Sequence, residues 1–337
     1  MTLPLNAGVI GLGVGARHAE VYRHHKGTRV AALCDLDPAV LAETGQRHPC
    51  ARLTRDAEDV LADPGIDLVS IASWDQHHHA QVVRAIEAGM HIFVEKPLTL
   101  SRDEAADIHD RLRLRPDVLL SSNLVLRRCP RFRRLKRMIA DGRFGRLYYL
   151  EADYDYGRIH KLIDGWRGQV PGYSLVLGGG VHMVDLVTWL ADERVVEVSA
   201  MGNRIATEAA GADFDNFDFV VATLKFAGGA VAKVTCNGGC VRPHYHGLEI
   251  YGTEATFINR SETGLIYDSR TPGAAPGQIT EAYPGRDKGS LLSAFIDAVI
   301  EDAKPEVDAD HVFESLAVCF AIEQAVHAGR TVAVDYF

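Results

Sequence analysis

Short apolar runs alternate with amphipathic segments over about the first 120 residues of the chain. Five runs have the length of buried strands, at residues 7–10, 29–34, 67–72, 91–94 and 118–121. The segments between them repeat apolar residues at helical spacing, as in 76–88 and 101–114, and Ser101 with Glu104 has the spacing of a capping box. Alternating strands and helices predict an α/β fold with a doubly wound parallel sheet.

After residue 122 the strands follow one another with short turns between most of them. They are expected at residues 146–156, 195–203, 217–226, 230–237, 247–251 and 256–258, with helices at 183–190, 291–301 and 312–328. Such a succession predicts an α+β region built on a large, open and mostly antiparallel sheet. The segment 271–285 is rich in Pro and Gly and is expected to be a surface loop. A length of 337 residues fits two domains, placed at 1–121 and 122–337.

Composition excludes several classes of partner. Hydrophobic residues make up 47% of the chain, and 36 basic residues against 45 acidic ones give a formal net charge of −9. This balance argues against nucleic acid and anionic membranes as partners. The N-terminal residues do not resemble a secretory signal, no long apolar stretch is present, and the six cysteines are scattered. Together these features predict a cytoplasmic protein with reduced thiols.

A glycine-rich turn follows the first predicted strand. It reads Gly11-Leu12-Gly13-Val14-Gly15-Ala16, and Gly11 permits a tight turn while Gly13 allows a pyrophosphate to approach the backbone. Ala16 is expected to be the small residue where the helix meets the strand. Asp35 ends the second strand and is placed to bind both adenosine ribose hydroxyls, which favours NAD over NADP. Alternatively, the loop is only a turn and Asp35 only a cap.

The segment Glu95-Lys96-Pro97 closes the strand at 91–94. The carboxyl ends of parallel strands face the ligand crevice, so Lys96 is a candidate for binding a substrate oxygen. The simpler alternative is an exposed surface lysine.

These motifs resemble the glucose–fructose oxidoreductase / inositol dehydrogenase family (Gfo/Idh/MocA). The matching pieces are Gly11-Leu12-Gly13, Leu33-Cys34-Asp35, Glu95-Lys96-Pro97, the helix start Gly180-Val181-His182-Met183-Val184-Asp185, and Ala294-Phe295-Ile296-Asp297-Ala298. Residues 73–78 look like a variant of a further family segment, in which His78 matches a histidine near the cofactor, while His77 and His79 are taken as bystanders. The resemblance covers nearly the whole chain.

The resemblance implies a Rossmann domain, a second domain whose open sheet serves oligomerisation, and a homodimer or homotetramer. It implies that Lys96 orients the substrate hydroxyl and that His182 exchanges its proton, a role that suits imidazole. The Lys96–Pro97 bond is expected to be cis. The predicted cofactor-binding residues are Gly11, Leu12, Gly13, Gly15, Ala16, Asp35, Ser73, Trp74, His78, Glu95 and Lys96.

One position departs from the family pattern. Many members carry an aspartate four residues before the histidine, and here that residue is Gly178. Asp164, Asp185, Tyr154 and Tyr156 are the candidates for a replacement. Asp185 has helical spacing from His182 and is expected either to orient the ring or to pair with another neighbour.

Polar residues near these motifs are candidates for substrate contact. A mixture of aromatic and polar side chains at 160–167 suits a sugar, although His160 is the weaker candidate there and a surface loop is the alternative. The predicted substrate-binding residues are Lys96, Asn123, Arg127, Lys161, Trp166, Arg167, His182 and Asp185.

Two further clusters leave alternatives open. The basic run 127–146 includes Arg131, Arg133, Arg134, Lys136, Arg137 and Arg143. It is expected to be a solvated helix face, or else a patch that binds a nucleotide-linked sugar. Cys236, Cys240, His244 and His246 have a cramped spacing for zinc, so no metal is predicted.

The sequence therefore predicts an oxidoreductase that transfers hydride between NAD, less favourably NADP, and a secondary alcohol or ketone of a sugar, nucleotide sugar or cyclitol. One alternative is a keto-sugar reductase in surface-polysaccharide or amino-sugar synthesis, and another is chemistry with a transient oxidation by NAD. A different class of function is a non-catalytic NAD-binding sensor or scaffold.

Overall fold

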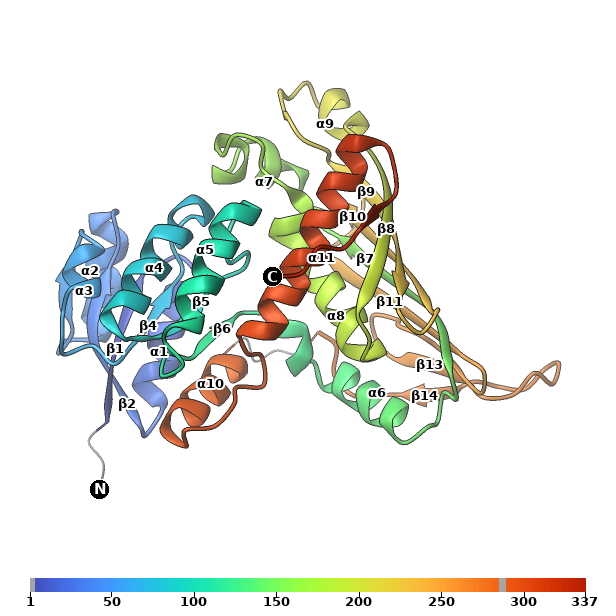
Figure 1. The fold of residues 1–337 in the computed structure, drawn as a ribbon, viewed down its shortest axis with the longest axis horizontal. Coiled ribbons are helices and arrows are strands. Elements are labelled where there is room, and N and C mark those ends of the chain that lie inside the picture. Colours follow the sequence, from blue (N-terminus) through green and yellow to red (C-terminus); the bar gives the residue numbers. More distant parts are fainter. Residues whose placement is uncertain (1–3, 285–288) are drawn as a thin grey trace. The chain divides into compact units, whose positions relative to one another are not determined.

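The computed structural model describes residues 4–284 and 289–337, which form two compact units (Figure 1). The first contains the described residues up to Leu124, helix α10 (Ser290–Ile300), the first residues of α11 (Ala309–Ala328) and Phe337. The second begins at Val125 and includes the remainder of α11. The first unit therefore takes in helices from the C-terminal part of the chain, where the sequence placed a single boundary after residue 121.

The first unit is built on a parallel sheet. In the described residues it has six strands, β1 (Leu5–Ile10), β2 (Thr28–Cys34), β3 (Arg52–Thr54), β4 (Leu68–Ile71), β5 (His91–Val94) and β6 (Leu120–Ser122). Their order is β3-β2-β1-β4-β5-β6, and every adjacent pair is parallel. The predicted doubly wound fold is confirmed. The strand order reverses between β1 and β4, and the ligand crevice of such sheets lies at the carboxyl ends of those strands.

Helices connect the strands of this sheet. They are α1 (Gly15–His24), α2 (Pro38–Arg47), α3 (Glu58–Leu61), α4 (His78–Ala88) after a 3₁₀ turn η1 (Asp75–His77), and α5 (Arg102–Arg113). Ser101 and Glu104 form the predicted capping box at the start of α5. Helix α10 joins this unit because its apolar face packs on the sheet, with the Phe295 ring 5.7 Å from that of Phe93.

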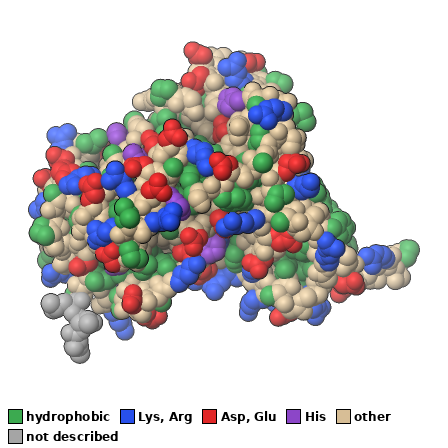
Figure 2. Space-filling model, viewed as in Figure 1, with side chains coloured by type: hydrophobic (Ala, Val, Ile, Leu, Met, Phe, Trp, Pro, Cys, Tyr) green, Lys and Arg blue, Asp and Glu red, His purple; other side chains and the backbone are tan. Residues whose placement is uncertain are grey.

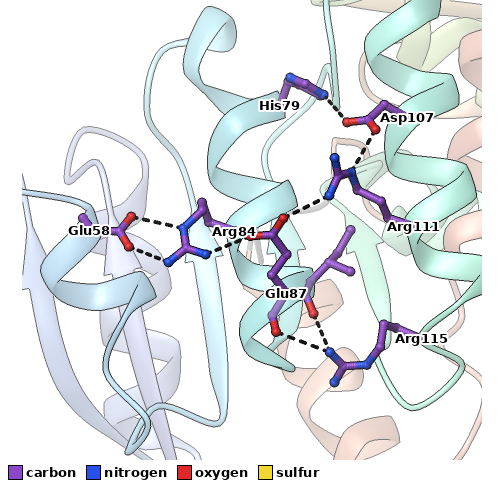
Figure 3. Close-up of polar contacts among 8 residues, drawn as sticks. Glu58, His79, Arg84, Glu87, Asp107, Arg111 and Arg115 are labelled. Carbon is purple, nitrogen blue, oxygen red and sulfur yellow. Dashed lines mark hydrogen bonds and ion pairs between the residues drawn. The ribbon is translucent and has the colours of Figure 1, made fainter.

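A chain of ion pairs links three of these helices along the surface of the first unit (Figure 3). Arg84 of α4 bonds Glu58 of α3 at 2.6 Å and Glu87 at 2.8 Å, and Glu87 in turn contacts Arg111 of α5 at 3.0 Å. Arg111 also bonds Asp107 at 2.8 Å, a carboxylate that His79 contacts at 2.8 Å. The chain aligns α3, α4 and α5, although exposed pairs of this kind contribute little individually to stability.

The second unit is built on a larger sheet. Its described strands number nine: β7 (Leu147–Asp155), β8 (Val195–Asn203), β9 (Phe219–Phe226), β10 (Val231–Asn237), β11 (Tyr245–Gly252), β12 (Thr256–Ile258), β13 (Gly264–Tyr267), β14 (Gly277–Ile279) and β15 (Val332–Ala333). Their order is β14-β13-β12-β11-β7-β10-β9-β8-β15. Strands β7 and β10 pair in parallel and the other pairs are antiparallel, so the predicted mostly antiparallel sheet is confirmed.

The prediction of a loop over 271–285 is wrong in part. Residues 277–279 form β14, in which Gln278 pairs with Leu265 of β13. A three-residue edge strand that contains Gly and Gln has too little apolar alternation to be predicted. Gly285, the last residue of that loop, lies outside the described residues.

The second unit also contains helices and short helical segments. They include η2 (Val125–Arg128), α6 (Pro130–Ala140), α7 (Ile159–Ile163), η3 (Trp166–Gln169), the π-helical segment η4 (Val176–Gly180), α8 (Val181–Ala191) and α9 (Ile205–Ala209). Helix α8 packs on β7 and β10. Alternate side chains of β7, namely Leu150, Ala152 and Tyr154, are therefore buried, while the residues between them stay partly exposed.

The basic run of α6 is only partly the solvated face that the sequence favours. Arg131 is 0% exposed, and it donates to the carbonyl oxygens of Glu281, Arg260 and Glu262 at 3.0, 2.5 and 2.7 Å. Arg134 pairs with Glu281 at 2.6 Å. Basic and acidic side chains are interspersed on the face drawn in Figure 2. Among the described residues, no helix is both long and apolar enough to cross a membrane.

Candidate active site

The glycine-rich turn lies where β1 ends and α1 begins. Gly11 has a φ of +83°, and a Cβ there would lie 2.6 Å from the backbone nitrogen of Ser73, so only glycine fits. Gly13 is exposed, and a Cβ there would meet nothing within 4 Å. The open space over Gly13, next to the N-terminus of α1, fits a pyrophosphate bound by backbone N–H groups.

Helix α1 approaches β1 closely at Gly15. A Cβ on Gly15 would lie 2.9 Å from Val9 of β1, whereas Ala16 is half-buried and is accommodated with its methyl group. Gly15 is therefore a further position of this turn at which a side chain would collide with the sheet.

Asp35 follows β2, next to the turn. Its carboxylate accepts the N–H of Leu12 at 2.6 Å and the N–H of Asp37 at 2.8 Å. The side chain is thus fixed against the glycine-rich turn, as both the ribose and the cap interpretation require. The helix cap of α2 is a separate residue, Asp37, whose carboxylate accepts the N–H of Ala39.

The turn after β4 holds the next predicted cofactor residues. His78 is fully buried, and its ring bridges two backbone carbonyls, Pro97 at 2.8 Å from Nδ1 and Ser73 at 3.1 Å from Nε2. The Ser73 hydroxyl donates to Gln81, and Trp74 is 45% exposed. His78 therefore joins the turn after β4 to the turn after β5, which carries Lys96.

Glu95 lies at the carboxyl end of β5. Asn123 donates to its Oε1 at 2.6 Å, and Nε2 of His18 lies 3.3 Å from the same oxygen. Burial raises the pKa of Glu95, but the hydrogen bond and charge of His18, the charge of Lys96 and the bond from Asn123 outweigh burial and hold the pKa at about 2. The role found for Asn123 is thus to anchor an ionised Glu95.

Lys96 is the half-buried residue that follows Glu95. The Lys96–Pro97 bond is cis, which confirms the prediction. The positive charge of Lys96 is one of the influences that lower the pKa of Glu95, and the residue lies just beyond the carboxyl end of β5.

In the second unit, three consecutive glycines lead into α8. A Cβ on Gly178 would lie 2.6 Å from Cζ of Tyr173, and one on Gly179 would lie 2.6 Å from Cζ of Tyr154. A Cβ on Gly180 would collide with Sγ of Cys236. Large side chains therefore fill the space beside all three glycines. The segment is π-helical, an irregularity that is frequent at functional sites.

His182 lies in the first turn of α8 and is buried. Its ring packs edge-to-face on His246 of β11, with the centroids 6.2 Å apart, and His246 packs on His244 at 4.7 Å. The Tyr283 hydroxyl accepts the backbone N–H of His246 at 2.7 Å and lies 3.1 Å from its Nδ1, which fixes the ring. Tyr154 packs on both His244 and His246.

The sequence pointed to His244 and His246 only as metal ligands, and it did not single out Tyr173 or Tyr283. Alternation along β11 places His246 on the buried face, a signal that was available. Within residues 4–284 and 289–337, no group of three or more His, Cys, Asp or Glu side chains is arranged to hold a metal ion. Burial raises the pKa of the Cys236 thiol, and all six cysteines carry free thiols.

Arg127 and Asp185, two of the residues predicted to bind substrate, form a buried ion pair with each other. Arg127 is 3% exposed and Asp185 is 0% exposed, and Arg127 Nη2 donates to Asp185 Oδ1 at 2.7 Å while Nε lies 3.0 Å from the same oxygen. Ser315 adds a contact at 3.4 Å. Asp185 thus pairs with another neighbour, one of the two roles considered for it.

The first residues of the segment 160–167 are exposed, whereas its last residues pack against other side chains. His160 and Lys161 are exposed on α7. Arg167 donates from Nε to the Tyr173 hydroxyl at 3.0 Å, and its guanidinium lies over the Trp166 ring, 4.5 Å from the centroid. Trp166 and Arg167 therefore both contact Tyr173, the side chain that fills the space beside Gly178.

Both units of the chain match families of known proteins. Residues 5–122 match the model of an oxidoreductase family with an NAD-binding Rossmann fold, and residues 132–258 match the GFO/IDH/MocA C-terminal domain. The chain is 23% identical over 345 residues to myo-inositol 2-dehydrogenase of Thermotoga maritima, covering 98% of this chain and 99% of that protein. It is 24% identical over 285 residues to 1,5-anhydro-D-fructose reductase of Ensifer adhaerens, covering 82% and 83%.

A solved structure of levoglucosan dehydrogenase, in complex with NADH and levoglucosan, has the same fold. The TM-score is 0.84 at 22% sequence identity, and the match covers 99% of this chain and 100% of that one.

Proposed function

The chain belongs to the GFO/IDH/MocA family of NAD(P)-dependent oxidoreductases, and from this premise we propose that it is an NAD-dependent dehydrogenase of a sugar or cyclitol. The observation that carries the proposal is the turn at the end of β1. Its open backbone at Gly13, its required glycine at Gly11 and the fixed carboxylate of Asp35 fit the pyrophosphate and the ribose of a dinucleotide. Bound NAD supplies a nicotinamide ring that accepts or returns hydride.

Lys96 and His182 are the proposed catalytic residues. Lys96 orients the substrate oxygen and stabilises negative charge on it, and its charge also lowers the pKa of the neighbouring Glu95. His182 takes the hydroxyl proton during oxidation and returns it during reduction. The packing of His246 against His182 holds that ring in place.

The substitution Lys96→Met tests this assignment. Turnover should fall at least 100-fold, while the affinity for NADH, followed by nicotinamide fluorescence, should change less than about threefold. Lys26→Met is the matched control, because Lys26 is exposed in the turn before β2. Turnover that survives Lys96→Met would refute the role of the lysine. Wild-type protein that binds NADH but oxidises no polyol would instead favour the non-catalytic sensor.

The preference for NAD over NADP is assigned to Asp35. A carboxylate there accepts ribose hydroxyls and repels a 2′-phosphate. Asp35→Ser should therefore lower kcat/KM with NAD and raise the NADP-to-NAD ratio at least tenfold. An unchanged ratio would mean that the Asp35 carboxylate serves only to accept the backbone N–H groups of Leu12 and Asp37.

The contacts of α6 favour a free sugar or cyclitol over a nucleotide-linked sugar. Arg131 is committed to buried carbonyls, Arg134 to Glu281, and Lys136 to the carbonyl of Trp189 at 2.6 Å. Fewer basic groups are thus available to bind a diphosphate than the sequence suggested.

A further inference from the structure

Arg55 lies beside the residue that follows Asp35. Strands β2 and β3 run in parallel, Cys34 pairs with Thr54, and the N–H of Asp35 donates to the carbonyl oxygen of Thr54 at 3.3 Å. Arg55 is the first residue beyond the carboxyl end of β3, and its Nε donates to the carbonyl oxygen of Leu36 at 3.1 Å. This bond anchors the guanidinium next to Asp35, at the edge of the sheet where a dinucleotide ribose binds.

The guanidinium of Arg55 keeps donors for a ligand at this edge. The residue is exposed, and its bond to Leu36 uses only Nε. A guanidinium also carries N–H groups on both Nη atoms. Within residues 4–284 and 289–337, Arg55 forms no ion pair with a carboxylate. Both Nη groups are therefore available to oxygen atoms of a bound molecule.

Negative charge lies around the end of β2. Burial, and then the charges of Asp35, Asp56 and Asp59, raise the pKa of the Cys34 thiol to about 11. These carboxylates oppose the approach of a phosphate and favour NAD, which has a free 2′-hydroxyl. The cation of Arg55 has the opposite effect at the same edge.

A phosphate on the 2′ oxygen of the ribose matches the donors of Arg55. Its oxygens accept two parallel N–H bonds from the planar guanidinium, and the opposite charges strengthen them. In dinucleotide-binding sheets an arginine near the end of the second strand accommodates the 2′-phosphate of NADP. Arg55 reaches that place from the end of the neighbouring strand, through its bond to Leu36.

We infer that Arg55 binds the 2′-phosphate of NADP, so that the protein uses NADP as a second cofactor beside NAD. Asp35 keeps NAD the preferred cofactor, and Arg55 offsets part of the repulsion that Asp35 exerts on the phosphate. The inference rests on the proposed dehydrogenase function and adds a second cofactor to the same site.

Binding measurements test the inference without turnover. The full chain would be titrated with NADH and NADPH, followed by nicotinamide fluorescence, and with 5′-ADP and 2′,5′-ADP, followed by calorimetry. Wild type should bind NADPH, more weakly than NADH. Arg55→Gln should raise the Kd of NADPH at least tenfold more than the Kd of NADH, because only NADPH loses the contact between phosphate and guanidinium. The two adenosine phosphates should show the same difference.

Arg29→Gln is the matched control. Arg29 is also exposed, and its Nε also donates to a single oxygen, Oδ1 of Asn6. It is the second residue of β2 and lies at the amino end of the sheet, opposite the edge that carries Asp35. Its substitution should leave the ratio of NADPH to NADH affinity unchanged.

A double variant separates attraction by Arg55 from repulsion by Asp35. Asp35→Ser should strengthen NADPH relative to NADH, because the carboxylate that repels the phosphate is gone. Adding Arg55→Gln should reverse most of this gain. A gain that the second substitution leaves undiminished would overturn the role of Arg55.

The remaining outcomes distinguish the inference from the proposed function. Wild-type protein that binds NADH but not NADPH overturns the inference and leaves the dehydrogenase intact. Equal losses of NADH and NADPH affinity in Arg55→Gln also overturn it, because they assign Arg55 to the adenine or the ribose. Binding of 2′,5′-ADP that depends on Arg55, without oxidation of any polyol, supports the phosphate site and overturns the dehydrogenase. Binding of none of the four nucleotides overturns both.

Discussion

Replacing Glu95 by Gln should destabilise the protein at neutral pH and much less in acid. The contacts of Glu95 lower its pKa from an ordinary 4.5 to about 2. A shift of this size corresponds to roughly 3 kcal/mol of stability, because each pKa unit is worth about 1.4 kcal/mol. Glutamine keeps the shape of the side chain but loses the charge that His18 and Lys96 stabilise.

The direction of the pH dependence follows from the lowered pKa. A carboxyl group with a lower pKa in the folded protein stabilises the fold fully above its unfolded pKa, here about 4.5. That contribution declines as the pH falls toward about 2, where the folded protein also takes up the proton. The stability difference between wild type and Glu95→Gln should therefore be largest at pH 7 and shrink progressively below about pH 5.

Urea unfolding of both proteins at several pH values between 7 and 3 measures this difference. Glu43→Gln is the matched control, because Glu43 is exposed on α2 and should give no pH-dependent difference. A loss below about 1 kcal/mol at pH 7, or a difference that stays constant on acidification, would refute the reasoning. It would mean that burial of Glu95 cancels the stabilisation by its partners.

The glycine-rich turn and the buried ion pair give two further predictions. Gly11→Ala should lower the melting temperature by several degrees, because it places a methyl group against the backbone near Ser73 at a positive φ, whereas Gly13→Ala should leave the melting temperature unchanged and weaken NADH binding at least tenfold. Equal effects of the two changes on stability and binding would contradict this division. Arg127→Met should cost about 3–5 kcal/mol in urea unfolding, and adding Asp185→Leu should recover part of that loss; additive losses would show that the two charges do not depend on each other.

The sequence predicted the strands whose side chains are apolar throughout or alternate cleanly. Strands β1, β5 and β8 lie where they were expected, since burial of one or both faces leaves a pattern in the sequence. The missed strands β3, β13, β14 and β15 have only two to four residues each. Their backbone hydrogen bonds to a neighbouring strand hold them in place, and no local pattern records that pairing.

Some features of the candidate site could likewise be predicted from the sequence, and others could not. Gly11 and Asp35 were predictable because a turn and a strand end require particular residue types at fixed spacing. The pairing of Arg127 with Asp185 joins residues 58 apart in the chain, so the sequence left both charges as candidates for substrate contact. Arg131 was assigned to a solvated face, although its guanidinium satisfies carbonyls that come about 130 to 150 residues later.

Gly178 shows what a change at one motif position means physically. Judged from the sequence alone, Gly178 only lacks the carboxylate that an aspartate would provide at this position. In the structure the space beside Gly178 is filled by Tyr173, which a methyl group at position 178 would displace, and Tyr173 is bonded to Arg167. The glycine is therefore the condition for a different side chain to lie beside the turn that carries His182. A chain that combined an aspartate at position 178 with Tyr173 would have to move the ring and break its bond to Arg167, so these residues constrain one another as a set. Exchanging Gly178 alone should accordingly damage the fold, because the new side chain would collide with Tyr173.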